Sequence, residues 1–160
     1  MKRHRKQKDL ARFDVTQLTA DDHALLADFD RRRAGFDQAL EASNIIYHRH
    51  TCPACGFPTL KERREYEVCM ICLWQDDGDD GDPTRVAPPN YVSLMQQRID
   101  VAGLLRAFER THLYDDSLVA VIAAIRAFDA RLDRGTARID RVDFAANLRN
   151  ILPTTPRPPP

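Results

Sequence analysis

Apolar residues recur at helical spacing in four stretches of the chain. The first follows Thr19, a helix N-cap with acidic residues in the turn behind it, and extends to about Ala42. Three more lie in the second half of the chain, at about 93–109, from 118 to about 132, and at about 141–152. We therefore expect one N-terminal helix and a C-terminal group of about three helices.

The segment between the first two helices has the short apolar runs of a β module. Residues 45–47 predict a strand that leads into it. Residues 59–60 and 66–68 predict two further short strands around a turn near residues 63–64. The expected fold class is α+β, with a small antiparallel β module flanked by the N-terminal helix and the C-terminal helices.

The organisation along the chain follows from the same pattern. Residues 1–9 are basic and polar and residues 153–160 are rich in proline, so we expect both tails to be disordered. Between them we expect a helical segment over 10–46, the β module over 47–92 and a helical region over 93–152.

Composition narrows the class of protein. The chain has 160 residues and a formal net charge of zero, with 24 residues of each sign, which argues against coating nucleic acid by bulk charge. No stretch has the run of apolar residues that a membrane-spanning helix needs, and no apolar segment follows the basic start as in a secretory signal. We therefore expect a cytoplasmic protein.

Four cysteines form two C-x-x-C pairs inside the β module. Cys52 and Cys55 are separated by thirteen residues from Cys69 and Cys72. Two such turns can place four thiolates in a tetrahedron, and cysteine pairs in a reducing compartment are more often metal ligands than disulfides. Four thiolates also fill the shell of a zinc ion. The sequence therefore predicts one structural Zn²⁺ in a zinc-ribbon-like module, with iron, disulfides or a redox dithiol as alternatives.

Three runs around these cysteines carry a family resemblance. They are Cys-Pro-Ala-Cys-Gly-Phe-Pro-Thr-Leu (52–60), Tyr-Glu-Val-Cys-Met-Ile-Cys-Leu-Trp-Gln-Asp-Asp-Gly (66–78) and Asn-Tyr-Val-Ser-Leu (90–94). Over about residues 47–98 the chain resembles the bacterial cysteine-rich CPCC domain, which implies a zinc-ribbon-like fold and metal binding. Ala54 replaces the family's middle cysteine, which implies that this cysteine is not a required ligand. Gln75 replaces a glutamate, so no role is assigned to that carboxylate.

The favoured function is a non-enzymatic zinc protein that binds another protein. Candidate partner contacts are the single tryptophan and the acidic loop behind it, namely Trp74, Asp76, Asp77, Asp79 and Asp80. The alternative for Trp74 is to cover a small core and shield the sulfur atoms. An inhibitor or immunity-type role is the specific form that the family resemblance implies.

The alternative function is a zinc ribbon that binds nucleic acid. Its candidate phosphate contacts are the basic residues at the start of the chain and three arginines in the first helix, namely Lys2, Arg3, Arg5, Lys6, Lys8 and Arg31 to Arg33. No aromatic residues are interleaved with the basic start, which favours a solubilising tail instead.

Other sites are not supported by the residues. A calcium loop starting at Asp76 or Asp77 lacks its closing glutamate, and residues 132–144 lack the front ligands of such a loop. His48 and His50 flank the first cysteine pair, but four cysteines already complete a zinc shell. No nucleophile elbow, phosphate loop or H-E-x-x-H motif occurs, so we expect no enzyme.

Overall fold

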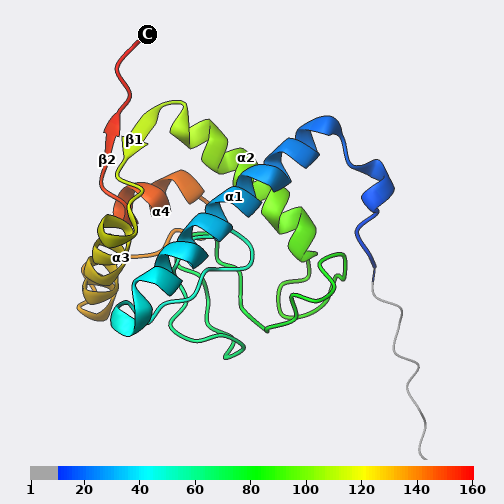
Figure 1. Ribbon diagram of the computed structural model, residues 1–160, viewed down its shortest axis with the longest axis horizontal. Helices are drawn as coiled ribbons and strands as arrows, with labels where there is room; N and C mark the ends of the chain where they lie inside the picture. The colour runs from blue at the N-terminus through cyan, green and yellow to red at the C-terminus, as the bar shows by residue number, and fades with distance from the viewer. Residues whose placement is uncertain (1–10) are drawn as a thin grey trace, which may run out of the picture.

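Four α-helices carry most of the regular structure in the computed structural model, which describes residues 11–160. They are α1 (Ala20–Ala42), α2 (Leu94–Glu109), α3 (Leu118–Asp133) and α4 (Phe144–Ile151). Two short 3-10 helices, Val15–Gln17 and Asn44–Ile46, flank α1. Figure 1 shows α1 lying across α2, with the loops of the cysteine segment gathered beneath them. The predicted α+β class and the placement of the helices are confirmed.

Each helix begins at a residue whose side chain caps it. The Thr19 hydroxyl accepts from the backbone N–H of Asp22, whose carboxylate accepts in return from the Thr19 N–H. Ser93 and Ser117 cap α2 and α3 in the predicted places. The last helix starts three residues later than expected, at Phe144, because the Asp140 carboxylate holds the two preceding N–H groups in a turn.

The strands predicted near the cysteines are mostly wrong. Residues 44–46 form a 3-10 helix, which begins at Asn44 with a φ of 58°. Pairing in the cysteine segment is limited to single bridges, His50 with Leu60 and Val68 with Gln75. Each bridge joins the two ends of one cysteine turn, so the chain folds back on its own C-x-x-C pair and residues 59–60 and 66–68 do not form a paired hairpin.

The two-stranded sheet lies at the other end of the chain. β1 (His112–Tyr114) pairs antiparallel with β2 (Thr154–Pro156), with Leu113 opposite Thr155. The prediction that 153–160 is disordered is therefore wrong for β2. Proline is tolerated on an edge strand, and beyond it the Arg157 N–H donates to the Thr111 carbonyl at 2.8 Å. The predicted basic tail 1–9 lies outside the described residues.

One core joins the cysteine segment to the helices. All four cysteines belong to a buried cluster that also holds side chains from every helix, among them Phe36, Leu105, Phe128 and Leu148. Phe57, next to the first cysteine pair, is completely buried. The C-terminal helices therefore pack on the cysteine segment and do not form a separate bundle. No helix within residues 11–160 has the length and apolar character to cross a membrane.

Candidate metal centre

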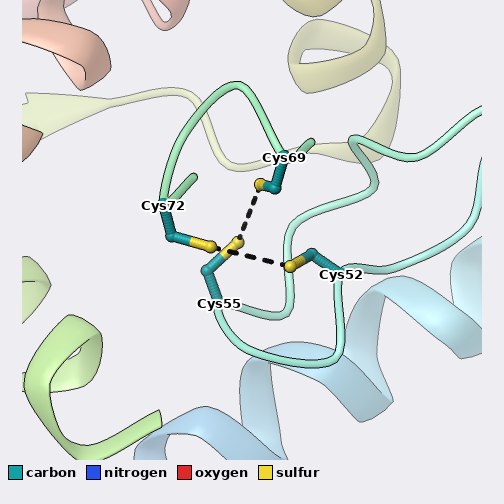
Figure 2. Close-up of side chains that lie close together, drawn as sticks. All are labelled: Cys52, Cys55, Cys69 and Cys72. Atoms are coloured by element: carbon teal, nitrogen blue, oxygen red, sulfur yellow. Dashed lines mark hydrogen bonds between the residues drawn. The ribbon is translucent and has the colours of Figure 1, made fainter. Parts of the chain in front are cut away.

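Two turns of the same backbone geometry carry the four cysteines, and we call them the first and second knuckle (52–57 and 69–74). In each, the N–H of the first cysteine donates to the carbonyl five residues later, at 2.8 Å. In each, the N–H of the residue after the second cysteine donates back to the carbonyl of the first, at 2.9 Å. This repetition aims two sulfur atoms from each knuckle at one point (Figure 2).

The residue after the second cysteine takes a left-handed conformation in both knuckles. Gly56 has a φ of 82°, and Leu73 in the second knuckle has a φ of 65°. Glycine adopts such angles without steric cost, whereas leucine does not. A Cβ atom at Gly56 would also lie 3.2 Å from the backbone nitrogen of Arg33 in α1. The glycine therefore permits both the turn and the close approach of α1.

The same substitution at two glycines should change stability in opposite directions. We expect Gly56→Ala to lower the free energy of unfolding by about 1–2 kcal/mol, since alanine is strained at positive φ and contacts α1. Gly35→Ala, in the interior of α1 with no atom within 4 Å of the new Cβ, should raise it by about 1 kcal/mol. Urea denaturation of both variants checks this, and equal effects would contradict the role given to Gly56.

The four sulfur atoms have the spacing of a tetrahedral metal site. Cys52 Sγ lies 3.7 Å from Cys72 Sγ, and Cys55 Sγ lies 3.7 Å from Cys69 Sγ. All four lie within 4.8 Å of one another. Ligands at a Zn–S distance of about 2.3 Å on a tetrahedron are separated by ~3.8 Å. The described residues thus bring the four predicted ligands together, and two of the sulfur pairs have the separation expected around a zinc ion (Figure 2).

Burial makes this cluster unfavourable for unpaired charge and favourable for a cation. Cys52, Cys55 and Cys69 are completely buried and Cys72 is 8% exposed. Burial raises the pKa of the Cys55 and Cys72 thiols well above its ordinary value. For Cys69, burial acts in the same direction, but hydrogen bonds from the other three cysteines outweigh it and lower its pKa. A divalent cation would stabilise the thiolate forms that this environment otherwise opposes.

Two groups outside the cysteine side chains form hydrogen bonds with the sulfur atoms. The N–H of Ala54 donates to Cys52 Sγ at 3.4 Å. The Thr59 hydroxyl lies 3.1 Å from Cys69 Sγ. Such outer contacts orient the ligands and spread their negative charge. Ala54 contributes through its backbone, which fits the inference that a thiol is not required at this position.

Side chains from three helices hold the knuckle carbonyls. In the first knuckle, Arg32 Nε of α1 donates to the Cys55 carbonyl and Arg98 Nε of α2 donates to the Pro53 carbonyl, both at 2.8 Å. In the second, Gln97 Nε2 of α2 donates to the Cys72 carbonyl at 3.2 Å and Asn147 Nδ2 of α4 to the Ile71 carbonyl at 3.4 Å. Sequence reasoning assigned no such role to these helix residues, because no local pattern signals it.

Two of the candidate partner contacts are buried, and this corrects the prediction for them. Trp74 is 7% exposed and belongs to the core, where it fits the alternative of covering the sulfur atoms. Asp76 is completely buried and accepts hydrogen bonds from Arg63 Nε at 2.7 Å and from the backbone N–H of Arg64 at 3.0 Å. Neither side chain is available to a partner.

The rest of the acidic loop is largely neutralised within the chain. Asp80 contacts Arg63 at 2.8 Å and Arg33 at 3.3 Å, and Asp79 contacts Arg85 at 2.8 Å. Asp77 accepts from the Asp79 backbone N–H. The ion pairs neutralise Asp79 and Asp80, so two of the candidate partner contacts already have their charge paired within the chain.

Of the candidate phosphate contacts, the structure describes the three arginines of α1. Lys2, Arg3, Arg5, Lys6 and Lys8 lie outside the described residues. In α1, Arg32 holds the first knuckle and Arg33 pairs with Asp80 and Asp37, which leaves Arg31 as the exposed member of the three. His48 and His50 are exposed and lie outside the four-cysteine cluster.

Comparison with known proteins finds a family match over the segment that contains the four cysteines. Residues 50–105 match the family model described as cysteine-rich CPCC. The match confirms the resemblance and extends it through most of α2, while α1, α3 and α4 lie outside it. No curated protein and no solved structure matches the chain.

Proposed function

We propose that this protein holds one structural Zn²⁺ through Cys52, Cys55, Cys69 and Cys72 and acts as a non-enzymatic interaction protein. The observation that carries the zinc site is the set of four buried sulfur atoms at tetrahedral spacing. Four thiolates complete the coordination of zinc and leave no position for water or substrate, which supports a structural ion. The location of the cysteines in the core shared by all four helices supports the same role.

A groove beside the second knuckle supports the interaction part of the proposal. This groove has a volume of about 200 Å³ and is lined by apolar side chains that include Leu73, Leu104 and Val142. Leu104 is 54% exposed and Val142 is 94% exposed. Apolar side chains that gather around a depression are typical of a surface that binds another protein.

Charge at the groove indicates the kind of partner. Three carboxylates line it, from Asp100, Asp140 and Asp143, beside the guanidinium of Arg141, and Asp143 also pairs with Arg149 at 3.9 Å. An amphipathic segment with basic residues around an apolar face would match this distribution. We therefore propose a basic amphipathic segment of another protein as the partner, with an inhibitor or immunity-type role as the specific form. The nucleic-acid alternative draws little support, since Arg32 and Arg33 are engaged within the chain.

The proposal is tested on protein purified without added metal. Elemental analysis should give about one zinc per chain, and stoichiometric iron would overturn the assignment of the ion. A partner retained through nuclease treatment should be lost in Leu104→Asp and kept in Val119→Asp, a matched change at an exposed apolar residue of α3 outside the groove. Equal loss in both variants, or a complex that nuclease destroys, would overturn the groove as the binding surface.

A further inference from the structure

A second, larger cavity shares no lining residue with the groove beside the second knuckle. It is bounded by α1, α2 and the connection between β1 and α3. Its volume is about 500 Å³, within the range of small-molecule sites. Phe36 of α1, Tyr114 of β1 and Leu118 of α3 supply its apolar lining. Neither the metal centre nor the proposed partner groove uses these residues.

Gly35 forms part of this cavity's lining without a structural need for glycine. It lies in the interior of α1, where glycine costs about 1 kcal/mol relative to alanine. Its φ is not positive, and no atom lies within 4 Å of where a Cβ would stand. Neither a turn nor close packing therefore explains this glycine. A long side chain at this position would occupy the cavity.

Arg32 supplies to the lining a cation that lies 5.5 Å from the centroid of the Phe57 ring and forms no ion pair among the described residues. The two other arginines of the cavity, Arg31 and Arg106, both pair with Asp28. Arg32 has no ion-pair partner in the part of the chain that the structure describes, and its Nη2 is shielded from water without a hydrogen-bond acceptor there. A buried donor that lacks an acceptor is costly, and a bound oxygen atom would relieve that cost after a small shift of the guanidinium.

The remaining polar groups limit the charge of a ligand. Glu109 and Asp116 also line the cavity and form no ion pair among the described residues, so its three arginines share the lining with three carboxylates, of which Asp28 pairs with Arg31 and Arg106. The Tyr114 hydroxyl donates to Glu109 Oε1 at 3.3 Å, and burial raises the Tyr114 pKa, which keeps this donor protonated. A balanced lining of this kind disfavours ligands that carry several negative charges, such as nucleotides.

We propose that this cavity binds a small monocarboxylate with an apolar, ring-sized body. The carboxylate meets Arg32, and the apolar body lies against Phe36 and Tyr114. The lining of this site includes no cysteine, and Arg32 is the residue that it shares with the surroundings of the first knuckle.

The test is a titration of the full-length protein, followed by amide NMR, with benzoate, benzylamine and phenyl phosphate as probes. Benzoate should shift the signals of residues around Gly35 and Tyr114, and it should bind roughly tenfold more tightly than benzylamine. Gly35→Leu should abolish binding by filling the cavity, whereas Gly35→Ala should retain it in a fold of equal or greater stability. Arg32→Gln should weaken benzoate binding and leave the benzylamine signal unchanged.

Three results would overturn the proposal. The first is the absence of benzoate-dependent shifts at the cavity. The second is binding that Gly35→Leu leaves intact, because the ligand would then lie elsewhere. The third is tighter binding of benzylamine or phenyl phosphate than of benzoate, which would contradict the role of Arg32. The metal content of each variant, measured alongside, separates a failure of this site from a failure of the zinc site, since Arg32 also contacts the first knuckle.

Discussion

The Cys55→Ser variant is expected to lose the cooperative fold of the whole chain. Apparent binding free energies of structural zinc sites are about 10–16 kcal/mol, while a domain of this size is stable by only about 5–15 kcal/mol. Cys55 is completely buried, and its cluster lies in the core that joins all four helices. Without a bound ion, the buried thiols would no longer be held together at the centre of this core. Circular dichroism during thermal unfolding, with elemental analysis of the same sample, measures the effect.

Chelation of the unaltered protein distinguishes the effect of losing the ion from the effect of the substitution itself. A strong chelator should remove the metal and the cooperative transition together, and added Zn²⁺ should restore both. Serine at position 55 should not be rescued in this way, because its hydroxyl is a poor ligand for zinc. A metal-free protein that still melts cooperatively at an unchanged temperature would contradict a structural ion and return attention to thiol chemistry.

Replacing Asp76 by alanine should destabilise the protein by about 3 kcal/mol. The carboxylate is completely buried and accepts from the side chain of Arg63, from the backbone N–H of Arg64 at 3.0 Å and from that of Gly78 at 3.2 Å. Its removal leaves Arg63 Nε and the backbone N–H groups of Arg64 and Gly78 without their acceptor. The expected loss of stability is at the lower end of the range for a buried ion pair, because the Arg63 side chain is 26% exposed and still pairs with Asp80 in the variant. Urea denaturation measures the difference, and Asp77→Ala serves as the control, since among the described residues the Asp77 side chain accepts a hydrogen bond only from the backbone N–H of Asp79.

The contribution of Asp76 should also depend on pH. Burial alone would raise its pKa, but hydrogen bonds from Arg63 and from the backbone outweigh burial and lower it. A carboxyl group with a lowered pKa in the folded state stabilises the fold at a pH above its unfolded value, about 3.9, and this stability is lost as the pH falls through the folded value. The gap in unfolding free energy between wild type and Asp76→Asn should therefore narrow below about pH 4. A gap that widens in acid would contradict this assignment.

The sequence by itself determined the features that depend on local interactions. The starts of α1, α2 and α3 follow from Thr19, Ser93 and Ser117, because a cap bonds to N–H groups within three residues of itself. The four candidate metal ligands follow from two C-x-x-C turns, because each turn presents two sulfur atoms whatever surrounds it. In each case the physical cause lies within one turn of the chain, so the pattern of residues is sufficient.

Only the tertiary structure decided how these parts are held together. Arg32 and Asn147 bond to knuckle carbonyls that lie 23 and 76 residues away. Residues 154–156 pair with β1 although the prolines of residues 153–160 predicted disorder, and Asp76 is buried although its acidic neighbours predicted exposure. A side chain that bonds to a distant backbone group, or a charge neutralised by a distant partner, has no periodic signature in the sequence. Such contacts form only when packing brings the segments together, because the same residues would equally satisfy their charges and hydrogen bonds in water.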